Sequence, residues 1–143
     1  MISAYFDDRE QERRKFTQEW WRYELPRYKT YITAITLAEI KRSKSVLRGR
    51  MFHLVEGLTE LPIESEIEET AEYYIRKGLV TRNHIADVTQ IAYCVVHKID
   101  FLATWNCEEL ANAHRKRRLR SLNSEMGWFT PEIATPYELV QEE

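Results

Sequence analysis

Four side chains that are widely separated in the sequence have types that could do chemistry together: Glu39, Asp87, Asn106 and Glu109. Three carboxylates and the oxygen of one carboxamide suit a hard divalent cation such as Mg²⁺ or Mn²⁺, which keeps several of its waters. Such a cation activates water and stabilises in-line displacement at a phosphodiester. The four residues are therefore the candidate catalytic set, with Glu39, Asp87 and Glu109 as the predicted metal ligands.

Each of these residues also has a purely structural interpretation. Thr36 followed by Glu39 is a capping-box pattern. Asp87 and Glu109 fall in the first turns of predicted helices, where the helix dipole stabilises negative charge, and Asn106 suits a helix cap. Asp87 is the hardest to explain structurally, because its predicted helical face is partly apolar and an unpaired acid there is costly.

Alternating strand and helix patterns would position these residues. An apolar surface covers most of the circumference of the helix expected at 84–99, which predicts a buried central element. Strands that alternate with helices predict an α/β fold with a mainly parallel sheet, and ligands bind at the carboxyl ends of such strands. Glu39 and Glu109 each lie four residues past a predicted strand end, so we expect them at one rim. The expected helices are 7–23, 36–50, 66–77, 84–99 and 108–126, and the expected strands are 31–35, 61–63, 101–105 and 132–135.

Composition predicts one folded domain over residues 1–143, with 43% apolar and 31% charged residues. The two cysteines lack CxxC or Cys/His spacing, which indicates reduced thiols and a cytoplasmic location. The chain has no apolar run of about 18 residues and no pattern of an export signal, so we expect neither a membrane span nor export.

Positive charge is concentrated in one segment of a chain whose net charge is -2. Residues 114–120 contain five lysines and arginines, and Arg115, Lys116 and Arg118 follow a predicted helix that leads away from the candidate site. A solvated helix face would explain this pattern, but it also suits a polyanion. We predict that these three residues bind a polyanionic substrate.

The segments ITLAEIKRS, HIADVTQIAYCVVHKIDFLATWNCEELANA and GWFTPEIATPYEL resemble the PIN domain family, in its PilT/VapC-like branch. The resemblance covers nearly the whole chain. It implies a three-layer α/β/α sandwich with a mainly parallel central sheet, and a metal-dependent ribonuclease, commonly the toxin of a toxin–antitoxin pair. It also implies an antitoxin partner and a homodimer. Carried over by residue, Glu39 and Asp87 match metal ligands, Asn106 matches the polar position after a strand, and Glu109 falls where many relatives carry a last acid.

The chain departs from this family at its beginning. Relatives start with a strand that ends in Asp-Thr or Asp-Ser, whereas Met1 and Ile2 already fall in the segment that follows it. Asp7 and Asp8 lie too far on to match. We therefore expect a single PIN-like domain that lacks its first strand and first aspartate, which leaves an open slot in the sheet.

Two explanations for this departure remain open: a start codon placed too late, or a weakened or inactive version of the protein. Under the hypothesis that the strand is missing, this chain binds metal weakly and has little nuclease activity, and adding a strand that ends in Asp-Thr restores cleavage. The alternative function is a non-catalytic module that binds RNA or an antitoxin on the same fold.

Overall fold

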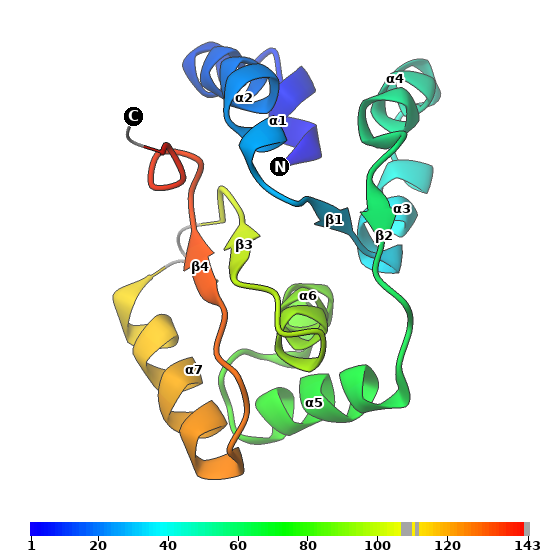
Figure 1. Ribbon diagram of the computed structural model, residues 1–143. Helices are drawn as coiled ribbons and strands as arrows, with labels where there is room; N and C mark the ends of the chain where they lie inside the picture. The colour runs from blue at the N-terminus through cyan, green and yellow to red at the C-terminus, as the bar shows by residue number, and fades with distance from the viewer. Residues whose placement is uncertain (107–109, 111, 142–143) are drawn as a thin grey trace. The chain divides into compact units, whose positions relative to one another are not determined.

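The computed structural model describes residues 1–106, 110 and 112–141, and the chain divides into two compact units. The first unit comprises Met1–Leu61 and Pro136–Glu143, and the second comprises Pro62–Thr135. Both units are mainly helical (Figure 1). Among the described residues no strand is longer than three residues.

The first unit contains four α-helices joined by short connections. Its apolar core consists of Ile40, Met51 and Val55, with Phe6, Trp21 and other partly buried side chains packed against them. Its strands form a parallel pair in which Tyr31 lies opposite Thr59. The elements are α1 (Ile2–Phe6), α2 (Gln11–Tyr23), the 3₁₀ helix η1 (Leu25–Arg27), β1 (Tyr31–Ile32), α3 (Ala34–Lys41), α4 (Ser45–Val55) and β2 (Thr59–Glu60).

Tyr137 and Leu139, near the end of the chain, contact α2 and the segment after it in the first unit. The Trp20 indole N–H and the Tyr28 hydroxyl both donate to the Leu139 carbonyl, at 3.1 and 3.0 Å. The Phe16 and Tyr137 rings lie 4.4 Å apart, centroid to centroid. Two hydrogen bonds to one carbonyl and a ring contact thus fix the returning chain on the aromatic face of α2.

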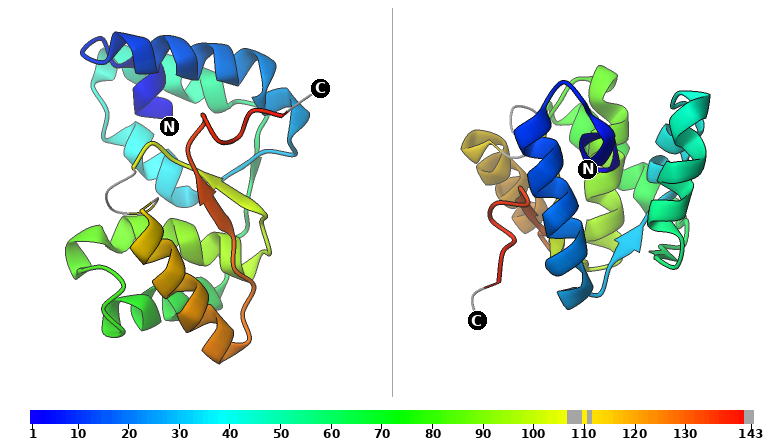
Figure 2. Two further views of the ribbon diagram at one scale, coloured as in Figure 1. Left: turned by 90° about the vertical axis from the view of Figure 1, so that its left-hand side faces the viewer. Right: turned by 90° about the horizontal axis from the view of Figure 1, so that it is seen from above.

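The second unit surrounds α6, which is buried on several sides as its sequence predicts. Val88 and Ala92 are fully buried, and Ile91 is 2% exposed. β3 and β4 pair in parallel, with Leu102 opposite Ile133, and run side by side in Figure 2. The elements are α5 (Ser65–Arg76), the 3₁₀ helix η2 (Arg82–His84), α6 (Ile85–Val96), β3 (Phe101–Ala103), α7 (Ala113–Met126) and β4 (Glu132–Ala134).

The expected three-layer α/β/α sandwich is wrong, because the described strands form two sheets of only two strands each. The expected strands are cut short by local competition for backbone and side-chain hydrogen bonds. β1 ends at Ile32 because the next residue, Thr33, caps α3 and accepts a hydrogen bond from the Thr36 N–H. β2 ends before Pro62, which has no N–H to donate; the Leu61 N–H still donates to the Ile32 carbonyl at 2.9 Å. The edge strand expected at 61–63 therefore lies at Thr59–Glu60 instead.

The helix expected over 36–50 is two helices, α3 and α4. α3 ends where the Ser43 hydroxyl donates to the Glu39 carbonyl at 3.0 Å, because this bond occupies an acceptor of the last helical turn. Lys44 then has an extended backbone, with ψ 137°, and precedes α4. α3 begins at Ala34, two residues earlier than expected, and Thr33 is its N-cap. The capping-box interpretation of Thr36 and Glu39 is therefore wrong.

Candidate functional site

Asp87 lies in the first turn of α6, and the structure brings it together with Asn106. The Asn106 side-chain nitrogen donates to Asp87 Oδ2 at 3.4 Å, across 19 positions of sequence. The Asp87 side chain is 30% exposed, so its carboxylate is open to solvent. An accessible acid beside an amide at a strand end is an arrangement that can bind a cation.

A short loop after β3 determines where Asn106 lies. The Thr104 N–H donates to the Ala134 carbonyl at 2.9 Å, which continues the β3–β4 pairing past Ala103. The Thr104 hydroxyl then accepts from the Asn106 N–H at 2.9 Å and turns the chain. Asn106 therefore lies just past the carboxyl end of β3.

His84 is a neighbour of Asp87 that the sequence reasoning missed. Its Nδ1 lies 3.4 Å from Asp87 Oδ2, the same oxygen that Asn106 contacts. The two residues are three positions apart, at the start of α6, where His84 takes the N-cap position expected for Asn83. The sequence signal that could have indicated this contact is a histidine three positions before an acid at the start of a helix. This imidazole supplies a second nitrogen that orients the carboxylate, and it carries positive charge when protonated.

Glu39 belongs to the first unit, where it lies exposed on α3. The amino group of Met1 is close enough to interact with its carboxylate. Burial lowers the pKa of this amino group below its usual range, and the negative charge of Glu39 opposes that shift. The role of Glu39 as a metal ligand stays a prediction. Glu109, the fourth residue of the candidate set, lies outside the described residues.

The described donors around Asp87 are few for a divalent cation. Within residues 1–106, 110 and 112–141, no group of three or more His, Cys, Asp and Glu side chains could hold a metal ion together. One carboxylate from Asp87 and an amide oxygen from Asn106 would leave most positions to water, as Mg²⁺ tolerates. The Asn106 nitrogen faces Asp87 here, so its oxygen would face a cation only after rotation of the amide.

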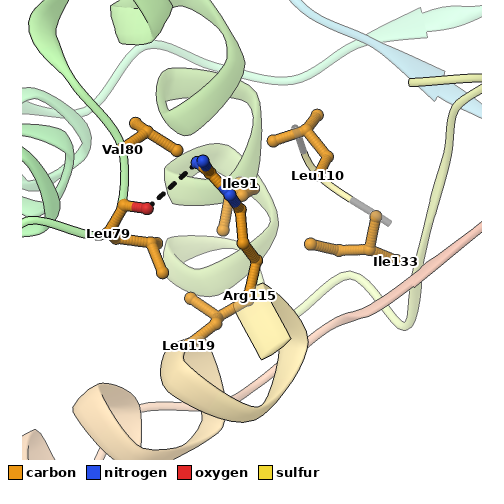
Figure 3. A pocket seen from close by; sticks show the side chains of 7 residues that line it. All are labelled: Leu79, Val80, Ile91, Leu110, Arg115, Leu119 and Ile133. Atoms are coloured by element: carbon orange, nitrogen blue, oxygen red, sulfur yellow. Dashed lines mark hydrogen bonds between the residues drawn. The ribbon is translucent and has the colours of Figure 1, made fainter. Parts of the chain in front are cut away.

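The predicted RNA-binding residues of α7 are partly used within the second unit. The Arg115 guanidinium donates to the Leu79 carbonyl at 3.1 Å and lines a small apolar cavity (Figure 3). Lys116 Nζ lies 4.0 Å from Glu132 Oε1, and Arg118 donates to the Lys77 carbonyl at 3.3 Å. Arg115 and Lys116 are half-buried, whereas Arg118 is exposed. Of the three, Arg118 is the best placed to meet a large ligand.

None of the known protein families, curated proteins or solved structures matches this chain at a significant level. The similarity to the PIN family therefore remains a resemblance carried by the quoted segments. Among the described helices, none combines the length and the apolar character that a membrane crossing needs.

Proposed function

We propose that this protein is a metal-dependent endoribonuclease of the PIN/VapC toxin type, which cleaves RNA phosphodiesters in the cytoplasm with Mg²⁺ or Mn²⁺. The contact between Asp87 and Asn106 is the observation that supports it most, because these two candidate residues lie 19 positions apart and yet meet at 3.4 Å. An antitoxin protein and a second copy of the chain are the partners that the resemblance adds to this proposal.

The chain's own residues would each have a defined task in this reaction. Asp87 and Asn106 would hold the cation, and the roles of Glu39 and Glu109 stay predictions from the sequence. When bound, the cation activates water and stabilises charge at the phosphodiester. His84 positions the Asp87 carboxylate through its Nδ1 contact at 3.4 Å. Exposed cations of the second unit would hold the RNA backbone.

Replacement of the central acid tests the proposal. Asp87→Asn keeps the size of the side chain and removes its charge, so we expect Mn²⁺-dependent cleavage of a 5′-labelled single-stranded RNA to be abolished while thermal unfolding is unchanged. Asp100→Asn is the matched control, because it makes the same charge change at an exposed residue of the same unit. Full activity of Asp87→Asn would refute the proposed site. Loss of cleavage in Glu39→Gln as well would support the wider acid set.

One observation favours a second function, a non-catalytic module that binds RNA or an antitoxin. Two nitrogens, from His84 and Asn106, already contact a single oxygen of Asp87, which leaves this acid less available to a cation. Metal titration separates the two functions. A binding module would show little Mg²⁺ or Mn²⁺ affinity and would still bind RNA with a strong salt dependence.

A further inference from the structure

Three cations from two different helices meet at one place in the second unit. Arg76 ends α5 and Lys77 follows it; their charged groups lie 5.8 Å from the centroid of the Tyr73 ring in each case. Arg118 reaches across from α7 and donates to the Lys77 carbonyl at 3.3 Å. All three cations are exposed. We call Arg76, Lys77 and Arg118 the α5–α7 corner, which lies where these two helices approach each other in Figure 1.

Aromatic side chains pack closely beneath this corner, although the charged groups of the corner face water. The Trp128 ring packs edge-on against Tyr73, with centroids 5.2 Å apart, and against Tyr74 at 6.2 Å. The buried Tyr74 hydroxyl donates to Asn123 Oδ1 at 2.5 Å and ties α5 to α7 a second time. The corner is therefore a preorganised surface, which binds at a lower cost in conformational entropy than a loose one.

Glu72 lies four positions before Arg76 on α5 and is already paired with Arg82. Both of its carboxylate oxygens accept from the Arg82 guanidinium, at 2.9 and 2.7 Å. Arg76 also interacts electrostatically with this carboxylate. Arg117 and Arg120 are also exposed on α7, but Arg120 is two positions from Arg118 and therefore lies on another side of the helix.

The negative end of the α5 dipole explains why cations gather at Arg76 and Lys77. It does not apply to Arg118, which lies near the middle of α7, beyond the turns in which a helix dipole acts. The three neighbouring cations of the corner suit a ligand that carries several negative charges.

We propose that the α5–α7 corner binds the phosphates of single-stranded RNA. This inference rests on the proposed function. Charge complementarity indicates that the ligand is a polyanion, and the proposed cleavage activity identifies that polyanion as RNA. A single strand follows a groove or stripe of cations with its backbone. The surface differs from the three α7 residues that the sequence indicates: it retains Arg118 and adds Arg76 and Lys77 from α5. Arg115 and Lys116 make contacts within the second unit, and their role in RNA binding stays a prediction.

Fluorescence anisotropy of a 5′-labelled single-stranded RNA tests the surface, with EDTA present so that binding is measured without cleavage. We expect Lys77→Gln to weaken binding about five- to tenfold at 50 mM salt, and to reduce the slope of log affinity against log salt by about 0.7. Arg76→Gln combined with Lys77→Gln should reduce that slope by about twice as much.

Lys98→Gln is the matched control, because it removes one exposed lysine charge from the same unit. Its neighbour His97 contacts the Pro62 carbonyl at 2.8 Å, just before α5 begins, whereas Lys77 follows the end of a 12-residue helix. The two lysines are thus separated by about 18 Å of helix. We expect Lys98→Gln to bind RNA as the unchanged protein does. Equal weakening by both variants, or no RNA binding by the unchanged protein, would overturn the inference.

Two further measurements separate this inference from the proposed function. Asp87→Asn in EDTA should keep full RNA affinity, because Asp87 is not part of the corner. If Asp87→Asn still cleaves RNA while Lys77→Gln loses binding, the proposed site fails and the corner stands. If a poly-glutamate peptide competes as well as unlabelled RNA of equal charge, and with the same sensitivity to Lys77→Gln, an acidic protein segment replaces RNA and the inference fails.

Discussion

The side chain of Asn106 contacts Asp87 Oδ2 at 3.4 Å and approaches it from the turn that follows β3. If these residues hold a cation, the amide either binds it or orients the carboxylate, and residues of this kind change metal affinity or activity by about 10–100-fold. We therefore expect Asn106→Ala to lower Mn²⁺-dependent cleavage by about that factor, measured as kcat/KM. Asn83→Ala, at an exposed residue of η2, is the control and should retain activity. Equal activity in both variants would contradict a role for Asn106.

Sequence reasoning located part of the site because strand-end geometry is a local property. A strand followed by a polar turn predicts that Asn106 leaves the carboxyl end of β3, and the periodicity of α6 predicts that Asp87 begins a buried helix. Both residues lie in these places. His84 was missed because the helix cap was assigned to Asn83, although His84 lies three positions before Asp87 in either assignment.

The sheet could not be predicted because strand patterns show which segments are extended but not how many residues pair. Thr33 is β-branched, as strand residues often are, yet its hydroxyl caps α3. β1 therefore ends after two residues. The ends of helices were more predictable. Gly78 and Gly127 both follow a helix and have positive φ, at 74° and 69°, as their positions in the sequence indicate.

A buried hydrogen bond joins α5 to α7 and should carry much of the stability of the second unit. The Tyr74 hydroxyl donates to Asn123 Oδ1, and both side chains are fully buried. Burial raises the pKa of Tyr74, so the hydroxyl stays protonated and remains a donor. Tyr74→Phe leaves the amide oxygen without this donor, and we expect a loss of about 1–3 kcal/mol in the free energy of unfolding. Urea unfolding measures it.

Tyr23→Phe is the control for this loss, because Tyr23 is 61% exposed. It should change the free energy of unfolding by less than about 0.5 kcal/mol. A Tyr74→Phe variant as stable as this control would mean that the buried bond contributes no net stability.

The ion pair between Glu72 and Arg82 predicts a pH dependence of stability. Hydrogen bonds from the Arg82 guanidinium hold the pKa of Glu72 below its usual range. A carboxylate with a lowered pKa in the folded state contributes stability above its unfolded pKa, about 4.3, and loses it as pH falls through the lower folded value. Glu72→Gln should therefore lower the Tm at pH 7 and leave it unchanged in strong acid.

Glu69→Gln provides the comparison on the same helix, since Glu69 is exposed on α5. Thermal unfolding of both variants across the acid range measures the effect. The interpretation fails if the Tm difference between Glu72→Gln and the unchanged protein persists below the pKa of the folded carboxyl, or if Glu69→Gln shows the same pH profile.

Replacing two glycines by alanine should change the stability of the protein in opposite directions. Neither position restricts the added methyl group, so the backbone conformation determines the sign. Nothing lies within 4 Å of a Cβ built at Gly49 or Gly127. Gly49 lies inside α4, where alanine should stabilise the protein by about 0.5–1 kcal/mol through the lower entropy of the unfolded chain. Gly127 ends α7 with φ +69°, a left-handed conformation that costs an L-residue about 1–2 kcal/mol. We therefore expect the urea midpoint to rise for Gly49→Ala and to fall for Gly127→Ala. A change of the same sign in both would show that the backbone conformation at these positions does not determine the effect.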